Sequence, residues 1–413
     1  MPEFLTLLPP DLAREKLLSH LSKLITDSDS IDIFHALGRV TATDVFAPHP
    51  LPDFQRTTVD GYAVRAKDTF GATDSMPAYL NLIGEVPMGD SPSFEIGPGQ
   101  CALIHTGGML PKGSDAVVMI EYTQRITDEI EIFKSVPDGE NIIHIGEDVA
   151  QGQLVIPSGT LIRPAEIGGL AALGFTTIQV ARKPRIGLIS TGDEVIDPSQ
   201  TPRPGQVRDV NSYTLGTLVE KSGGEAVRYG IFSDQFSVLK DAAAKALSEC
   251  DVVIITAGSS ASTRDMTADV IRQLGEPGVL VHGINTRPGK PTILGVCKDK
   301  AVIGLPGNPV SALVNGYLFV VPVIEKILGA LPKPKASAMA ILTVNLPSQA
   351  GREDWVPVKL VENPKSKIKN FNAVPIFGKS NLIFTLASAD GLVRISPDAT
   401  GVSAGEEVEV ILI

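Results

Sequence analysis

The sequence has few cysteines and few aromatic residues. Its 413 residues include three cysteines, Cys101, Cys250 and Cys297, which lie far apart and fit no Cys-x-x-Cys spacing. That pattern excludes a disulfide framework and a thiolate metal site. Aromatic residues make up 5% of the chain, so the cores are expected to consist of Val, Ile, Leu and Ala. At roughly 150 residues per domain, the length predicts about three domains.

The sequence also has no excess of basic residues. Lys and Arg number 36 against 47 Asp and Glu, a net charge of −11. A nucleic-acid-binding protein needs a basic surface to displace counterions, so we expect no nucleic-acid partner. Glu3 and two prolines stand where a secretory signal would be basic. The apolar stretch 315–331 is broken by Pro322, Glu325 and Lys326. We therefore expect a soluble, cytoplasmic protein with no membrane partner.

The first 182 residues mix helical and β patterns. Residues 11–26 place leucines on one face and predict an amphipathic helix, and 32–37 predict a short one. Residues 47–143 alternate short β-branched runs with Pro and Gly turns, which is typical of a small β-rich domain. A further helix is predicted over 164–174, where Pro164 stands near its start.

From residue 184 the pattern becomes an alternation of strands and helices. Such an alternation predicts a parallel, doubly wound α/β sheet with right-handed crossovers. A Pro-rich linker over 331–337 follows, and the remaining apolar runs predict a small β-barrel or sandwich. The strands expected there are 340–346, 355–361, 382–388, 391–396 and 406–413.

Three loops follow predicted strands of the α/β segment and contain residues that bind anions or cations. They are Ser-Thr-Gly-Asp-Glu at 190–194, the hydroxyl-rich 256–265, and Leu-Pro-Gly-Asn-Pro at 305–309. Ligands of open α/β sheets bind at the carboxyl ends of strands, and a helix N-terminus suits phosphate. Each loop alone could be an ordinary turn or helix cap. Three of them at one sheet edge favour a functional site.

A fourth element is the turn Arg-Pro-Gly-Lys-Pro at 287–291, where two cations on a rigid turn suit an oxyanion. The strings at 60–65 and 105–108 alone would pass as turns. Neither a P-loop nor a Gly-x-Gly-x-x-Gly after a strand is present. A kinase, an ATPase or a dehydrogenase is therefore disfavoured.

Together, six strings in order resemble the molybdopterin molybdenumtransferases, the MoeA-type enzymes that are similar to the C-terminal domain of gephyrin. The strings are Asp60–Arg65, Thr106–Gly107 with Gly113–Val118, Gly146–Asp148, Ser190–Glu194, Pro288–Pro291 and Leu305–Pro309. The resemblance runs from about residue 10 to 413. It implies a multidomain α/β plus β fold. The implied parts are an elongated N-terminal dimerisation domain (1–46 and 144–182), an inserted β-rich domain (47–143), a central doubly wound molybdopterin-binding α/β domain (183–330) and a C-terminal β-barrel domain (331–413).

The resemblance also implies an activity. The family inserts molybdate, or tungstate, into adenylylated molybdopterin with Mg²⁺ and releases AMP and the finished cofactor. It acts as a homodimer whose cleft lies between the α/β domain of one subunit and the inserted domain of the other. The upstream adenylyltransferase is a candidate partner. The substrate brings its own dithiolene sulfurs, which is consistent with the scarcity of cysteine here.

By resemblance, catalytic roles fall on Asp60, Thr106, Asp148, Glu194 and Asp265, and Mg²⁺ binding on Glu194 and Asp265. Carboxylates are the ligands that place Mg²⁺ against phosphate oxygens. The implied substrate-binding residues are Ser190, Thr191, Gly192, Asp234, Ser260, Arg287, Lys290, Pro306, Gly307, Asn308, Arg352 and Ser380.

Some positions depart from the family pattern. Thr57-Thr58-Val59 replaces the usual Ser-Ala-Met, Ser262 replaces a glycine, and Arg287 stands where lysine is common. These changes leave the choice between molybdate and tungstate open. Two alternative functions are an adenylyltransferase of the preceding step and a gephyrin-like scaffold. The inserted domain and the barrel speak against the first, and the combination of acids with Lys290 speaks against the second.

Overall fold

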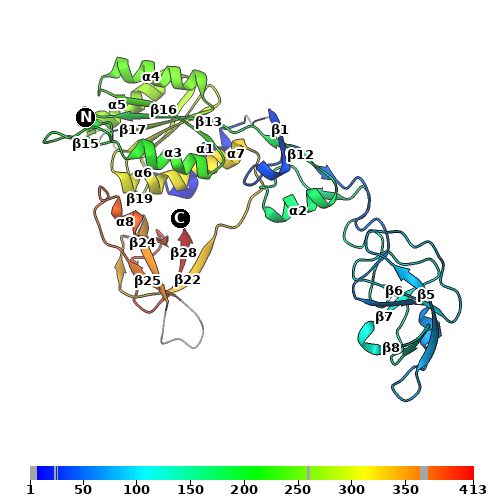
Figure 1. The fold of residues 1–413 in the computed structure, drawn as a ribbon. Coiled ribbons are helices and arrows are strands. Elements are labelled where there is room, and N and C mark those ends of the chain that lie inside the picture. The colour runs from blue at the N-terminus through cyan, green and yellow to red at the C-terminus, as the bar shows by residue number, and fades with distance from the viewer. Residues whose placement is uncertain (1–6, 23–24, 26, 258–260, 363–370) are drawn as a thin grey trace.

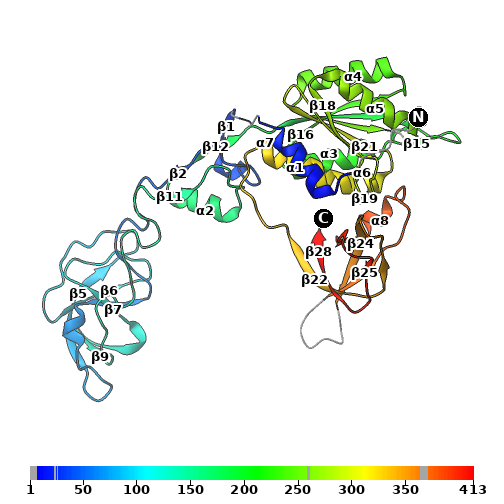
Figure 2. The same cartoon turned by 180° about the vertical axis from the view of Figure 1, so that it is seen from behind.

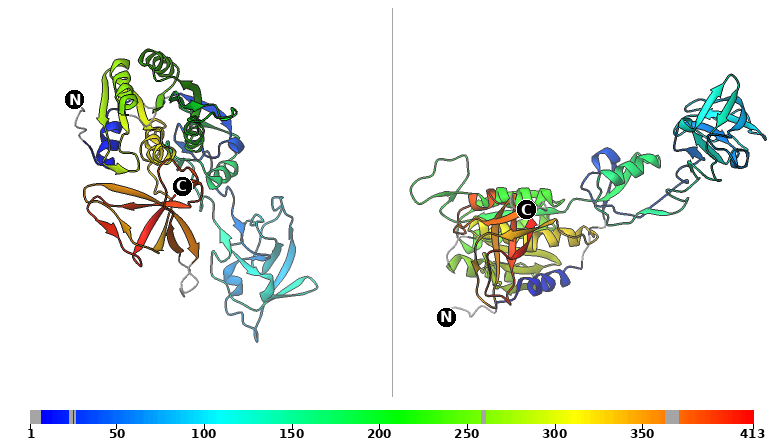
Figure 3. Two further views of the ribbon diagram at one scale, coloured as in Figure 1. Left: turned by 90° about the vertical axis from the view of Figure 1, so that its left-hand side faces the viewer. Right: turned by 90° about the horizontal axis from the view of Figure 1, so that it is seen from below.

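The computed structural model describes the chain except residues 1–6, 23–24, 26, 258–260 and 363–370, and it describes no side chains for 257 and 261–265. The described residues form an elongated molecule (Figure 1). An α/β region and a β-barrel lie at one end, a β-rich region lies at the other, and a slender arm joins them. In two further views the β-rich region again lies apart from the α/β region (Figure 3). The predicted mixed α/β, multidomain class is confirmed.

The arm consists of two chain segments, one running outward and one returning. β1 pairs antiparallel with β12, and β2 pairs with β11. Aliphatic side chains of both segments share a small core with α2, so neither segment is buried without the other. The arm elements are β1 (Ser28–Asp32), η1 (Ile33–His35), β2 (Val45–Phe46), β11 (Leu154–Ile156), α2 (Pro164–Ala172) and β12 (Thr177–Ala181). The α2 helix agrees with the predicted 164–174 segment.

The β-rich region is a six-stranded sheet with the order β7-β4-β6-β5-β9-β8. Gly61 in β4 is needed there, because a Cβ at this position would overlap the carbonyl oxygen of Val118 in β7. The elements are β3 (Arg56–Thr57), β4 (Gly61–Val64), η2 (Ala66–Thr69), β5 (Ala78–Val86), β6 (Gln100–Ile104), β7 (Ala116–Met119), η3 (Ile120–Tyr122), β8 (Thr123–Ile126), β9 (Glu129–Ile132) and β10 (Ile142–Ile143). The predicted small β-rich domain is thus present.

The α/β region holds a six-stranded sheet with the order β16-β13-β17-β21-β20-β18. The strands are β13 (Arg185–Thr191), β16 (Glu225–Phe232), β17 (Val252–Ala257), β18 (Pro277–His282), β20 (Ile293–Cys297) and β21 (Lys300–Pro306), with the short pair β14 (Val195–Ile196) and β15 (Val207–Arg208) beside them. The prediction of an all-parallel sheet is wrong for β20, which is antiparallel to both of its neighbours. A tight turn at Lys298 and Asp299 joins β20 to β21. A parallel pair would have needed a longer crossover.

Helices cover both faces of this sheet. The helices are α1 (Pro10–Ser19), α3 (Asn211–Lys221), α4 (Phe236–Glu249), α5 (Ala261–Leu274), α6 (Pro309–Asn315) and α7 (Val321–Ile327). One hydrophobic core contains side chains of α1, α3, α6 and α7, and a second contains side chains of α4 and α5. The first helix ends at Ser19, well before the predicted residue 26. The predicted domain boundaries stay predictions, and α1 lies on the α/β sheet rather than on the arm.

A single long helical segment runs from Pro309 to Ile327. It contains α6, the π-helical turn η4 (Gly316–Val320) and α7. Within the described residues it is the one helix long and apolar enough to cross a membrane, and 67% of its window is buried inside the protein. That burial is what a helix packed on a central sheet shows.

The C-terminal region is a closed five-stranded barrel of β22 (Ser337–Leu342), β24 (Glu353–Glu362), β25 (Phe371–Pro375), β26 (Gly391–Ile395) and β28 (Glu407–Leu412). A short pair, β23 (Leu346–Pro347) and β27 (Gly401–Val402), accompanies it. The strand predicted over 382–388 is wrong, because this run contains the helix α8 (Phe384–Ala387). The strand β19 (Thr286–Arg287) leaves the α/β region and pairs in parallel with β24. The barrel lies directly below α6 and β19 (Figure 2).

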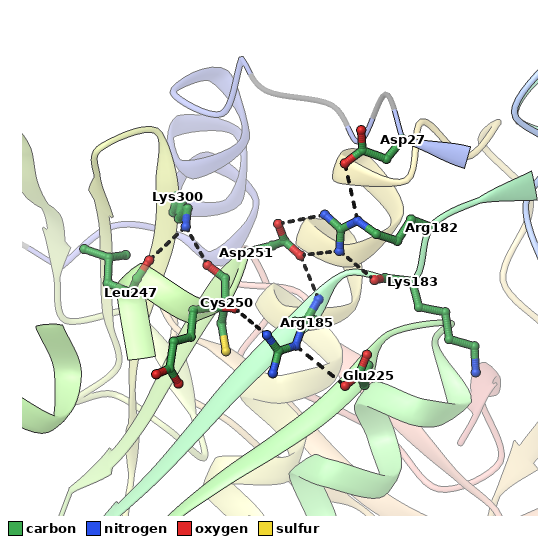
Figure 4. Close-up of polar contacts among 10 residues, drawn as sticks. Asp27, Arg182, Lys183, Arg185, Glu225, Leu247, Cys250, Asp251 and Lys300 are labelled. Carbon is green, nitrogen blue, oxygen red and sulfur yellow. Dashed lines mark hydrogen bonds and ion pairs between the residues drawn. The ribbon is translucent and has the colours of Figure 1, made fainter. Parts of the chain in front are cut away.

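The arm meets the α/β region at Arg182 (Figure 4). Two guanidinium nitrogens of Arg182 donate to the carboxylate of Asp251 at 3.0 and 3.1 Å, and the backbone N–H of Arg185 donates to it at 2.8 Å. Burial alone would raise the pKa of Asp251, but these hydrogen bonds hold it below its ordinary value. The ion pair therefore fixes the first residues of β13, where the returning segment of the arm enters the sheet.

Candidate functional site

Two cavities meet at the carboxyl ends of the parallel strands, where the barrel approaches the α/β region. The cationic cavity, of about 950 Å³, lies between residues 286–291, the loop 306–311 and the barrel. The acidic cavity, of about 550 Å³, lies over residues 190–195 and 202–211. Both are lined by Asn308 and Asn381. They are therefore neighbouring cavities on either side of the 305–309 loop.

The cationic cavity is lined by Arg287, Lys290, Arg352 and Lys379 and by a single acid, Asp354. Its formal charge is thus +3, inside a protein whose net charge is −11. Guanidinium and ammonium groups bind oxyanions through short, charge-assisted hydrogen bonds. The cavity therefore suits a multiply charged anion.

The barrel side of the cationic cavity is held by an ion pair. Arg352 donates from Nε and from its second terminal nitrogen to Asp354 at 2.7 and 2.9 Å, and Asp354 is 3% exposed. This two-pronged contact raises the pKa of Arg352. Asn308 Nδ2 donates to Ser380 Oγ at 3.0 Å. The barrel thereby contacts the loop that opens α6, with Ser380 and Arg352 in place along the wall.

The acidic cavity contains Glu194 and Asp209 opposite one cation, Arg208. Asp209 is 7% exposed and accepts a hydrogen bond from Ser190 Oγ at 2.8 Å and one from the N–H of Ser212 at 3.1 Å. Thr191, the last residue of β13, and Gly307 also line this cavity. Its chemistry is that of oxygen acceptors, which suit a hard cation or the N–H groups of a ligand.

Gly192 and Asp234 lie next to the acidic cavity. The N–H of Gly192 donates to Phe232 O at 3.2 Å, and the N–H of Asp234 donates to Asp193 Oδ1 at 3.3 Å. Burial raises the pKa of Asp234, and the negative charges of Asp193 and Glu194 raise it further. Three acids thus crowd the ends of β13 and β16. A bound cation would relieve their repulsion.

Three predicted residues lie elsewhere. Asp60 Oδ1 accepts hydrogen bonds from the N–H of Thr106 at 2.7 Å and from its Oγ1 at 3.0 Å, on the surface of the β-rich region. These bonds lower the pKa of Asp60. Asp148 lies, exposed, on the turn that leads back to the arm. Because these residues belong to the far end of the molecule (Figure 1), one chain does not bring them to the two cavities.

Two predicted residues cannot be placed in the same way. Ser260 lies outside the described residues, and so does the side chain of Asp265, whose backbone belongs to α5. Their roles stay predictions. Among the side chains that the structure describes, no three His, Cys, Asp or Glu residues gather closely enough to hold a metal ion by themselves.

The two cavities also contain residues that sequence analysis missed. Asp209, Asn211 and Asp354 are nearly buried and line them. Asn211 Nδ2 donates to Gly307 O at 2.9 Å and so ties α3 to the 305–309 loop. An Asp just before a helix N-terminus was a usable signal for Asp209. For Asp354 the signal was its place two residues after Arg352, because the alternation of a strand puts these two side chains on one face.

Comparison with known proteins agrees with this architecture. Residues 8–174 match the model of the MoeA N-terminal region (domain I and II), 187–326 that of a probable molybdopterin binding domain, and 339–413 that of the MoeA C-terminal region (domain IV). The chain is 33% identical to the molybdopterin molybdenumtransferase of Haemophilus influenzae, covering 97% of each chain. It is 32% identical to that of a Nostoc species, over 93% of this chain and 88% of the other. A crystal structure of the molybdopterin biosynthesis moeA protein from Pyrococcus horikoshii superimposes with a TM-score of 0.86 at 34% identity, covering 99% and 100% of the two chains.

Proposed function

The chain belongs to the molybdopterin molybdenumtransferase family, and from this premise we propose how its two neighbouring cavities perform the reaction. As a member it is a transferase of molybdenum cofactor biosynthesis. The proposed substrates are adenylylated molybdopterin and molybdate, or tungstate, and the proposed products are the metal-containing cofactor and AMP. The observation that carries this proposal is the +3 cavity that lies beside an acidic one and shares Asn308 and Asn381 with it.

The cationic cavity is proposed to bind the oxyanion. Arg287, Lys290 and Arg352 supply the charged donors, and Ser380 supplies a hydroxyl group. Asp354 holds the Arg352 guanidinium in one orientation, so less side-chain freedom is lost when an anion binds. Pro306 and Asn308 line the same space and lead to the acidic cavity.

The acidic cavity is proposed to hold the adenylylated end of the substrate with Mg²⁺. Mg²⁺ typically takes one or two protein carboxylates together with phosphate oxygens, so the absence of a three-ligand cluster among the described side chains fits this arrangement. Glu194 and Asp265 are the proposed ligands. Bound Mg²⁺ would neutralise charge on the phosphoanhydride. Asp234 and the backbone groups of residues 190–192 and 307 would position the phosphates and the pterin, and Ser260 is proposed to bind the substrate as well.

A homodimer is proposed to complete the site. Asp60, Thr106 and Asp148 lie far from both cavities in one chain, so a second copy must bring them there. The arm offers apolar surface for such an interface, since Phe34, Leu37 and Phe46 are 79%, 60% and 52% exposed. We assign the N-terminal arm to dimerisation, the β-rich region to the partner's cleft and the α/β region to molybdopterin binding.

The cellular setting follows from the chemistry. We propose a soluble protein of the cytoplasm, which receives its labile adenylylated substrate from the upstream adenylyltransferase. The alternative of adenylyl transfer is less favoured, because the chain also has the MoeA N-terminal and C-terminal regions in order. A scaffold function is less favoured as well, because it would not require the cationic cavity.

The test is a reaction with purified components. Protein, adenylylated molybdopterin and Mg²⁺ are combined with molybdate or tungstate, and AMP release and cofactor formation are followed separately. We expect both products to form together and to require the oxyanion. AMP release without metal insertion, or neither product with a folded dimer, would contradict the proposal.

A further inference from the structure

The turn that carries Arg287 and Lys290 is anchored by hydrogen bonds that its backbone carbonyl groups accept. Gly289 O accepts hydrogen bonds from Thr292 N at 3.1 Å and from Thr292 Oγ1 at 2.8 Å. Lys290 O accepts one from Ile284 N at 2.8 Å. Because these carbonyls point inward, the two cationic side chains are left exposed and line the cationic cavity.

The third inward carbonyl is held by a side chain from another element. Asn315, the last residue of α6, is 0% exposed, and its Nδ2 donates to Pro288 O at 3.1 Å and to Ser311 O at 2.8 Å. Its Oδ1 is buried and has no hydrogen-bond partner among the described residues. A flipped amide would put that oxygen against two carbonyls, so the orientation is fixed.

An unpartnered buried amide oxygen lowers stability, and an apolar residue of the same size would avoid that loss. The presence of an asparagine at position 315 is therefore explained by the two hydrogen bonds that its amide donates, and not by packing. The fit is close on the other side as well. Gly289 has φ +109°, and a Cβ there would overlap Nδ2 of Asn315. The turn cannot move relative to α6 without losing this contact.

The same short helix contacts both anion-binding elements. α6 begins at Pro309, directly after the Pro306–Asn308 loop, and ends at Asn315, against the cationic turn. Beyond Asn315 the backbone becomes π-helical at Gly316–Val320. The position of Lys290 relative to the loop is thus set through one rigid seven-residue helix.

We propose that Asn315 is a positioning residue for the oxyanion: it fixes Lys290 relative to the 305–309 loop and so sets how tightly molybdate or tungstate is bound. This rests on the proposed function, in which Lys290 contacts the anion. Asn315 itself touches no substrate. Its effect comes from preorganisation, because an anchored turn presents its ammonium group without further ordering.

Two variants separate positioning from packing. Asn315→Leu keeps the volume and removes both donors. Asn315→Thr can still bond the carbonyl four residues back, Ser311 O, but its hydroxyl is too short to reach Pro288 O. Val314→Ala is the matched control. Val314 is 1% exposed in the core of the same helix, so the substitution should lower stability without removing a hydrogen bond to the turn.

Equilibrium binding of molybdate, tungstate and adenylylated molybdopterin is measured on the full-length protein, with thermal melting of each variant. Both Asn315 variants should weaken oxyanion binding about tenfold. They should leave adenylylated molybdopterin binding within about twofold. Val314→Ala should lower the melting temperature with unchanged oxyanion affinity. Wild-type oxyanion affinity in folded Asn315→Leu or Asn315→Thr would overturn the inference, and so would an equal loss in Val314→Ala.

A double-mutant cycle with Lys290→Ala decides whether the effect passes through Lys290. In that background Asn315→Leu should weaken oxyanion binding by less than about twofold, because coupled residues are not additive. Full additivity would overturn the positioning role. If Lys290→Ala alone changes neither ligand's affinity, the proposed anion site itself fails, which is a different outcome from failure of the Asn315 inference.

Discussion

Asp60 in the β-rich region and Asp234 in the α/β region were predicted for the same active site, yet their carboxyl pKa values shift in opposite directions. The backbone N–H and the hydroxyl of Thr106 lower the pKa of Asp60, which is fully exposed. Burial and the neighbouring Asp193 and Glu194 raise the pKa of Asp234. The first acid is already satisfied as an anion. The second stands among like charges and gains from a cation or a proton.

This difference indicates that the acids of the two regions have different functions. The α/β region collects acids that need a counter-charge, beside a cavity with three excess cations. The β-rich region offers an acid in a fixed hydrogen-bonded state, ready to be brought to a partner. Four experiments test this difference between the two regions.

The largest effect is expected for Glu194→Gln. The substitution keeps the shape but removes a charge from the crowded acids, so the fold should remain and substrate binding should be near normal or tighter. AMP release should fall by about a hundredfold or more, since Mg²⁺ would be poorly held. Melting, substrate binding and AMP release are measured on one preparation. Wild-type AMP release across a Mg²⁺ titration would remove Glu194 from the metal site.

A smaller loss is expected for Lys290→Ala. A charge-assisted contact contributes about 1.5–3 kcal/mol, which corresponds to about one to two decades in affinity. Binding of the oxyanion or of adenylylated molybdopterin should weaken by that amount, as titration would show. Lys112→Ala, a cation on the β-rich surface, serves as the control and should change neither affinity.

The next experiment tests whether Asp60 of one subunit and Glu194 of the other belong to one cleft. Asp60→Asn and Glu194→Gln proteins, each nearly inactive, are mixed under conditions of subunit exchange. In a mixed dimer one of the two clefts keeps both acids, so activity should rise to about a quarter of wild type. Activity that stays at the level of the single variants, with exchange confirmed by mass, would argue against a shared cleft.

The smallest effect concerns stability and pH. Folding raises the pKa of Asp234, so its protonation stabilises the folded state at pH values below the ordinary pKa of 3.8. This contribution is lost as the pH rises through the raised pKa. Asp234→Asn should therefore melt about 1 °C higher than wild type near pH 7, with reduced activity. The gain should disappear as the pH falls below 3.8. A lower melting temperature at neutral pH would mean that the carboxylate is stabilising.

Sequence patterns predicted most elements, because buried strands such as β13 and β17 are continuous apolar runs. They failed at 382–388, where the mostly apolar run contains the four-residue helix Phe384–Ala387, which buries Leu386 and leaves Phe384 80% exposed. They also missed the antiparallel β20, although the absence of a helical segment before β21 was visible. A run without a crossover should have been assigned to a hairpin.

The loops 190–194 and 305–309 and the turn 287–291 were predicted from their residue types, and the family resemblance assigned their roles. The resemblance supplied Arg352 and Ser380, which no loop rule would have joined to Lys290. It did not supply Asn315 or Asp354. Asn315 matters through Pro288 O, 27 residues away in the chain, and such a contact leaves no periodicity or spacing. Asp354 stands two residues after Arg352 at the start of β24, so strand alternation places both side chains on one face.

The pairing of β19 with β24 affects how the chain could be divided. The barrel is attached to the α/β region covalently through residues 330–336 and, independently, by main-chain hydrogen bonds at Thr286–Arg287. We therefore expect a protein cut within 330–336 to keep its two pieces associated through this pairing, whereas the uncut connection keeps the two regions at high local concentration. Removing the barrel would strip the turn of its neighbouring strand as well. Thr286 and Arg287 of the α/β region and Asp354 of the barrel line the same cavity, so the site belongs to both regions together.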